Sequence, residues 1–168
     1  MRNFVIVFLI LIFNGCSNMN LSDYKDKKPL LKLEEYFEGK TIARGVFEDR
    51  FGNIKKSFKV FIDGTWDGQF LVLKEDFIYD DGSKDYREWK IEKDKNNPNA
   101  YYGYAEGVIG IASGFVSGNA FNWKYAFKLQ VGKNKVNVKF DDWMFLQEDG
   151  YLINLSLIHI SEPTRLDD

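Results

Sequence analysis

Apolar and polar residues alternate with a period of two along much of this chain, most clearly over residues 120–129. One face of that segment carries Phe121, Trp123, Tyr125, Phe127 and Leu129. This alternation predicts a half-buried β-strand. Gly118-Asn119 before it and Gly132-Lys133-Asn134 after it provide residues that tolerate the positive φ angles of tight hairpins. Residues 136–144 are therefore predicted to be its antiparallel partner.

Similar alternation from residue 40 onward predicts a series of short strands, at 41–49, 54–62, 65–74, 77–79, 86–93, 101–106 and 108–116. Turn signals separate them: Asp63-Gly64 is predicted to be a hairpin turn, and residues 80–83 and 96–99 are further turns. Short strands spaced roughly 8–12 residues apart are typical of an all-β fold. Sequential hairpins favour an antiparallel up-and-down β-barrel, because closure removes exposed strand edges. The mixed pattern of residues 30–37 predicts a short helix that plugs or flanks one end.

Composition agrees with a single globular domain: of 168 residues, 45% are hydrophobic and 17% aromatic. The formal net charge of −2 gives no electrostatic reason to expect a nucleic-acid partner.

The chain begins with a predicted signal peptide, residues 1–15, whose core is the unbroken apolar run 4–13. This run is too short to span a bilayer comfortably. Gly15 precedes Cys16, the single cysteine, and this arrangement resembles a bacterial lipobox. The resemblance implies a lipid anchor on Cys16, the alternative being an ordinary secretory signal with an incidental cysteine. Because Ser17 rather than Asp follows, the outer membrane is expected, with the domain facing the periplasm. The polar residues 16–29 are predicted to be a tether.

Residues 155–165, LSLIHISEPTR, agree at every position with the translation of a transposase-based sequencing adapter. We therefore expect residues 155–168 to be an adapter-derived tail, so that the barrel domain covers 30–154 and its native carboxyl end is missing. On this hypothesis His159, the only histidine, has no role. A barrel that lacks its closing strands would also have an open edge.

Four motifs carry a family resemblance: Gly-Val-Phe-Glu-Asp-Arg at 45–50, Phe-x-Val-x-Ile-Asp-Gly-x-Trp at 58–66, Gly-Asn-Ala-x-x-Trp-x-Tyr at 118–125 and Phe-Asp-Asp-Trp-Met at 140–144. With the lipobox, the chain resembles the DUF3833 family of uncharacterised bacterial lipoproteins over about residues 31–154. The resemblance implies localisation and shape but no activity. In addition, Gly64-Thr65-Trp66 is similar to the Gly-x-Trp of lipocalins, which favours a calycin-like barrel.

The candidate ligand-binding residues are aromatic and charged. The aromatic set could line an apolar cavity or could simply fill the core, and consists of Trp66, Trp89, Trp123, Tyr125 and Trp143. Glycines at 103, 107, 110, 114 and 118 leave room beside one wall. Asp141 and Asp142 are neighbours on a strand, so one of them is expected to face inward. An inward carboxylate needs a partner, and Arg44, Arg50 and Arg87 are the candidates. The pair is either a structural ion pair or a site for a ligand head group.

Enzymatic chemistry is not expected. With Cys16 in the anchor and His159 in the tail, no cysteine or histidine remains for a nucleophilic triad or a metal site, and no cofactor is expected. The leading expectation is binding of a lipid or other apolar molecule. The alternative is an envelope interaction or assembly factor with a filled barrel and no small ligand. A third option is an isomerase or hydrolase that uses paired carboxylates.

Overall fold

The computed structural model describes residues 19–48, 53–131 and 134–160, which form nine β-strands preceded by two short helices. The helices are the 3₁₀ helix η1 (Leu21–Tyr24) and the α-helix α1 (Leu33–Phe37). The strands are β1 (Gly39–Glu48), β2 (Ile54–Trp66), β3 (Phe70–Tyr79), β4 (Lys84–Lys93), β5 (Ala100–Tyr104), β6 (Val108–Ser117), β7 (Ala120–Val131), β8 (Asn134–Leu146) and β9 (Leu152–Ile160).

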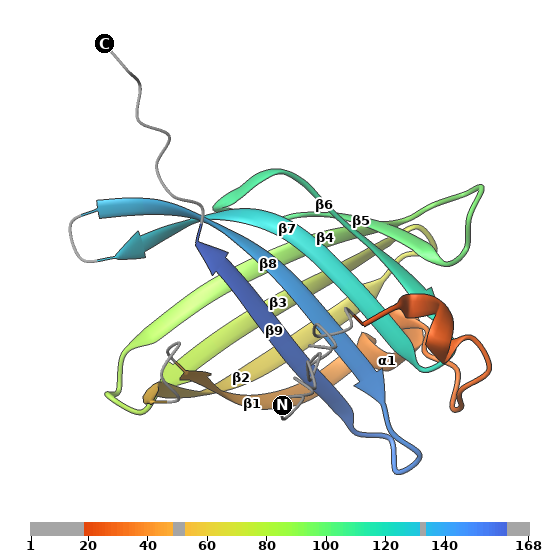
Figure 1. Cartoon of the computed structure of the whole chain (residues 1–168), viewed down its shortest axis with the longest axis horizontal. Helices are drawn as coiled ribbons and strands as arrows, with labels where there is room; N and C mark the ends of the chain where they lie inside the picture. Colours follow the sequence, from red (N-terminus) through yellow and green to blue (C-terminus); the bar gives the residue numbers. More distant parts are fainter. Residues whose placement is uncertain (1–18, 49–52, 132–133, 161–168) are drawn as a thin grey trace, which may run out of the picture.

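Each strand pairs antiparallel with the next one in the chain, so the sheet runs from β1 to β9 in sequence order. The predicted all-β, up-and-down architecture with a short N-terminal helix is confirmed. The sheet curls into a half-barrel (Figure 1). Among the described residues β1 and β9 are not paired with each other, so the barrel is not closed.

The β9 strand shows the consequence of this open edge. Its large apolar side chains stay exposed on both faces, with Ile153 and Leu155 on one side and Ile158 on the other. An unpaired edge also leaves a row of backbone donors and acceptors without strand partners. This edge is therefore a surface on which further β-pairing can occur.

The prediction of a hairpin turn at Asp63-Gly64 is wrong, because both residues lie inside β2. The chain turns instead at Asp67 and Gly68, where the Asp67 carboxylate accepts hydrogen bonds from the backbone N–H groups of Gln69 and Phe70 at 2.9 and 2.7 Å. Gly64 serves a different purpose. A Cβ atom there would lie 1.8 Å from the carbonyl oxygen of Phe37, so the glycine lets the backbone of α1 approach the sheet.

Helix α1 closes one end of the half-barrel, as the sequence predicted for residues 30–37. Leu31, Leu33 and Phe37 are buried in the same cluster as Leu71 and Ile91. Full burial of each leucine stabilises the fold by about 1.5–3 kcal/mol. The hydrophobic effect therefore holds the short helix against the ends of β2, β3 and β4.

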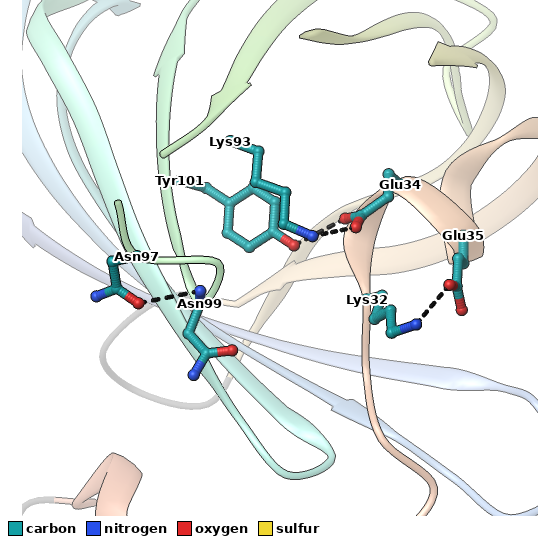
Figure 2. A network of polar contacts seen from close by, with 7 residues as sticks. All are labelled: Lys32, Glu34, Glu35, Lys93, Asn97, Asn99 and Tyr101. Atoms are coloured by element: carbon teal, nitrogen blue, oxygen red, sulfur yellow. Dashed lines mark hydrogen bonds and ion pairs between the residues drawn. The ribbon is translucent and has the colours of Figure 1, made fainter. Parts of the chain in front are cut away.

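A buried polar contact fixes α1 further (Figure 2). The Glu34 carboxylate accepts hydrogen bonds from the Lys93 ammonium group and from the Tyr101 hydroxyl, the latter at 2.7 Å. Burial alone would favour the neutral acid, but the hydrogen bonds from Lys93, from the Glu34 backbone and from Tyr101 outweigh it, so the pKa of Glu34 is lowered. The carboxylate is therefore ionised and fully paired at neutral pH.

Glu34→Gln is expected to lower the free energy of unfolding by about 1–3 kcal/mol at neutral pH, because Lys93 loses its charged partner. A carboxyl whose pKa is lowered by folding stabilises the protein above its unfolded-state pKa and loses this contribution as the pH falls through the folded-state pKa. The difference between variant and parent should therefore shrink progressively as the pH falls below about 4. Urea unfolding followed by tryptophan fluorescence measures it.

Glu35→Gln is the matched control, because Glu35 lies on the same helix and its side chain is 67% exposed in its ion pair with Lys32. It should change stability by less than about 1 kcal/mol. Equal effects of the two substitutions would show that Glu34 does not hold α1 to the sheet.

Candidate functional site

The concave side of the curled sheet, which we call the inner face, brings together three of the predicted aromatic residues. The ring centroid of Trp89 on β4 lies 5.7 Å from that of Trp123 and 5.2 Å from that of Tyr125, both on β7. These contacts join two strands that are separated in the sheet by β5 and β6. The curl of the sheet is thus filled by aromatic side chains at this point.

Trp123 occupies the room that two glycines leave. A Cβ atom on Gly103 would lie 2.5 Å from the Trp123 ring, and one on Gly114 would lie 2.6 Å from it. Gly107 is covered in the same way by Phe127, at 2.6 Å. The space beside Gly103, Gly107 and Gly114 is therefore filled by side chains of the protein itself.

The other two tryptophans lie apart from this group. Trp66 is half-buried and packs against the core at the end of β2. Trp143 contacts Tyr24 and Phe145, each with a ring-centroid distance of 6.2 Å. Tyr24 belongs to η1, so the segment within the predicted tether covers Trp143 on the outer face. Trp143 and Trp123 consequently do not share a cavity.

Asp141 and Asp142 point to opposite faces, as the alternation of a strand requires. Asp141 accepts a hydrogen bond from Asn122 at 2.6 Å and lies 3.5 Å from the Lys124 ammonium nitrogen, on the outer face. Asp142 is 5% exposed and faces inward. Arg44 does not reach it: the Phe58 ring covers the neighbouring Gly45 on the inner face, which puts Arg44 on the outer face.

Some predicted residues lie outside the part of the chain that the structure describes. These are the signal peptide at 1–15, the lipidation site Cys16, and Arg50.

Asp142 and the polar residues around it, Glu75, Arg87, Tyr125 and Ser156, form a group that we call the inner cluster. Glu75 and Arg87 are directly opposite each other on β3 and β4, and Tyr125 forms a side-chain hydrogen bond with Asp142. The Ser156 hydroxyl also donates to Asp142, at 2.5 Å, from the segment predicted to be adapter-derived. Arg87 lies between two aromatic rings, 5.6 Å from the Phe77 centroid and 5.0 Å from that of Phe127. Of the two arginine candidates among the described residues, Arg44 and Arg87, Arg87 is the one whose charge acts on Asp142.

Burial shifts the ionisation of the inner cluster. It raises the pKa of Glu75 to about 7, against the opposing charge of Arg87, and the negative charge of Asp142 adds to the rise. Burial also raises the pKa of Asp142 to about 6, although Ser156, Tyr125 and Arg87 favour the charged form. The pKa of Tyr125 is raised by burial and by Asp142. Both carboxyl groups can therefore gain or lose a proton near neutral pH.

Aromatic side chains continue from the inner cluster toward the end of the half-barrel away from α1. They are half-buried, and we call them the aromatic wall: Phe58, Phe77, Tyr79, Phe127 and Phe140. The Phe140 ring stacks on Tyr125 at a centroid distance of 4.7 Å, which connects the wall to the inner cluster. An open groove at the sheet edge here takes in residues of both faces, with Phe58 and Tyr79 from the inner face and Arg44 from the outer face. This half of the inner face retains accessible aromatic surface.

Within the described ranges, no group of three or more His, Cys, Asp or Glu side chains is placed to hold a metal ion. In those same ranges no helix has the length and apolar character needed to cross a membrane.

The comparisons with known proteins give one match, the family model described as "Protein of unknown function (DUF3833)", which covers residues 10–160. The chain belongs to the DUF3833 family. This confirms the family resemblance of the motifs at 45–50, 58–66, 118–125 and 140–144. Neither a curated protein nor a solved structure matches the chain.

In this DUF3833 protein, Glu75 is a residue of the candidate site that was not predicted from the sequence. A signal for it exists, because Leu71, Leu73 and Glu75 alternate along β3 and the two leucines are buried. The inward carboxylate pair is thus Glu75 with Asp142, whereas the adjacent pair Asp141-Asp142 is divided between the two faces.

Glu75→Gln is expected to raise the free energy of unfolding by about 1–3 kcal/mol near pH 8 and to leave it unchanged near pH 4. The pKa of Glu75 is higher in the folded state than in the unfolded chain, so its contribution to stability is lost as the pH rises through about 7. Glutamine resembles the neutral acid and avoids this loss. Urea unfolding at the two pH values measures the difference.

Asp76→Asn provides the control, since Asp76 is the next residue on β3 and is exposed. It should give a similar small change at both pH values. A Glu75→Gln effect that is the same at pH 4 and pH 8 would contradict a buried, titrating carboxylate.

Proposed function

We propose that this DUF3833 protein is a lipid-anchored protein of the bacterial cell envelope that binds an apolar or amphiphilic small molecule on its inner face, without catalysis. The observation that carries the proposal is the half-exposed aromatic wall next to the inner cluster. Small-molecule sites combine mostly apolar surface with a few polar groups that orient the ligand. The aromatic wall supplies the first, and Arg87, Glu75 and Asp142 supply the second.

The two ends of the half-barrel support the same assignment. The α1 end is filled by Leu33, Trp89 and Trp123, each at most 5% exposed. At the other end Phe58, Phe77 and Tyr79 contact one another with centroid distances of 6.0–6.4 Å and remain partly exposed. An apolar ligand would therefore enter at the open end and stop where the tryptophans fill the interior.

Anchoring rests on the sequence pattern at Cys16. A lipidated Cys16 would hold the domain at the membrane surface, and that membrane is a source of apolar ligands. The anchor is not required for binding itself, so the anchor and the binding site can be tested separately.

A second candidate function has an observation in its favour. The outer face of β1–β3 exposes a group of apolar side chains, with Ile42 at 56%, Val46 at 52%, Phe61 at 39% and Ile78 at 39%. Exposed apolar patches often mark protein interaction sites. An envelope interaction or assembly factor would use this outer face and would need no small ligand.

The test uses the full chain with Cys16→Ser, which removes the anchor site, and the neutral fluorescent probe N-phenyl-naphthylamine. Saturable binding is expected, and Phe77→Ala should weaken it about tenfold, the equivalent of about 1.4 kcal/mol of lost contact. Ile78→Ala is the matched control, because it removes an apolar side chain from the opposite face of the same strand and should leave affinity unchanged. Absence of saturable binding, or equal loss in both variants, would contradict the inner-face site and favour the interaction factor.

A further inference from the structure

The titratable groups in and around the inner cluster include more acids than bases. Glu75 comes from β3, Arg87 and Asp85 from β4, Tyr125 from β7 and Asp142 from β8. At the rim, Lys56 of β2 lies 2.9 Å from Asp81 and stacks over Tyr79. Since Lys56 is neutralised by Asp81, the described residues of the interior provide one guanidinium, that of Arg87, against the buried Asp142 and the half-buried Glu75. The inner cluster therefore carries an excess of negative charge when both acids are ionised.

Between the residues that the structure describes, no direct ion pair neutralises either carboxylate. The ion pairs between described residues do not include Glu75, Arg87 or Asp142. Asp142 has hydrogen bonds from Tyr125 and Ser156, whereas no hydrogen bond joins Glu75 to another described residue. Buried carboxylates without a charged partner are costly, and a cation brought by a ligand would remove that cost.

The surrounding rings also suit a cation. Arg87 already lies against the faces of Phe77 and Phe127, which shows that this aromatic surface accommodates positive charge. Tyr125 and Phe140 present two more rings, stacked on each other, beside Asp142. Aromatic faces combined with carboxylates are the chemistry by which proteins recognise ammonium groups.

We propose that Glu75 and Asp142, flanked by the aromatic wall, bind the ammonium head group of a cationic or zwitterionic amphiphile. This inference rests on the proposed function, because the apolar part of the ligand would lie on the aromatic wall. It adds the class of ligand: an alkyl ammonium compound rather than a fatty acid or a neutral hydrocarbon. In a zwitterion, Arg87 would contact the anionic part while the two carboxylates contact the ammonium group.

The protonation of the cluster gives this ligand class a distinct signature. Binding of a cation favours the ionised carboxylates, so protons are released and affinity increases as the pH rises through the pKa values of about 6 and about 7. An anionic amphiphile would show the opposite trend, since the neutral acids repel it less. A neutral amphiphile would show little dependence on pH.

The experiment compares three chain-matched compounds as competitors of the fluorescent probe on the Cys16→Ser chain: dodecyltrimethylammonium, dodecanol and dodecyl sulfate, all below their micellar concentrations. The quaternary ammonium keeps its charge at every pH, so any pH dependence comes from the protein. We expect it to bind at least about tenfold more tightly near pH 8 than near pH 5, and more tightly than dodecanol near pH 8.

Glu75→Gln should remove most of this pH dependence and lower the affinity for dodecyltrimethylammonium at pH 8, whereas Asp76→Asn should change neither. Because Glu75→Gln is expected to be more stable than the parent at pH 8, its loss of affinity cannot come from unfolding. Dodecanol binding should be unaffected by Glu75→Gln, which shows that the aromatic wall is intact.

Two results would overturn the inference in different ways. If dodecanol or dodecyl sulfate binds as tightly as the ammonium compound at pH 8, the head-group assignment is wrong while the proposed binding function stands. If none of the three compounds displaces the probe and the probe itself does not bind, both the head-group assignment and the proposed function are wrong.

Discussion

The curl of the sheet depends on the packing of Trp123 over Gly103 and Gly114. Neither glycine could carry even a methyl group without a shift of the Trp123 ring. With the indole in that space, β7 comes close enough to β4 for Trp89 to contact both Trp123 and Tyr125. The same approach of the strands places Arg87 beside Phe127. It also brings Asp142 close enough to Glu75 for their charges to interact. The inner cluster is thus a consequence of how tightly two glycine-containing strands allow the sheet to bend.

Two glutamates, the buried Glu34 and the half-buried Glu75, have different partners at the two ends of the half-barrel. Glu34 receives hydrogen bonds from Lys93 and Tyr101, and its pKa is lowered. Glu75 faces Arg87 across the β3–β4 pair without a direct ion pair, and its pKa is raised to about 7. The first arrangement stabilises the attachment of α1. The second costs stability at neutral pH, because an ionised carboxylate is held away from water without a full partner.

Much of the inner face could be predicted from the alternation of residues along the strands. It placed Trp123 and Tyr125 on one face of 120–129 and required Asp141 and Asp142 to diverge, as they do. The same rule argues against grouping Trp143 with the inner residues, because its neighbour Asp142 faces inward. The contact of Trp143 with Tyr24 could not be predicted, since it depends on where η1 packs.

Glu75 escaped prediction for a specific physical reason. Asp63-Gly64 has the composition of a hairpin turn, and the strand after it was predicted to cover residues 65–74, which left Glu75 outside it. In the structure Gly64 is needed inside β2 because the Phe37 carbonyl oxygen approaches it, and β3 extends through Glu75 to Tyr79. A glycine required by a tertiary contact and a glycine required by a turn have the same local sequence signal.

Glu75 has no hydrogen bond or direct ion pair with another described residue, and this is the strongest structural reason to regard the inner face as a binding surface. A glutamine at this position would fill nearly the same volume and avoid the cost of a buried charge. Glu34 shows that this fold can provide a buried glutamate with two hydrogen-bond donors where the carboxylate only has to hold the structure together. Residues that lower stability and make no compensating structural contact are characteristic of functional sites. The half-buried carboxylate of Glu75, on the same face as the aromatic wall, fits that description, because a cation brought by a ligand would neutralise it.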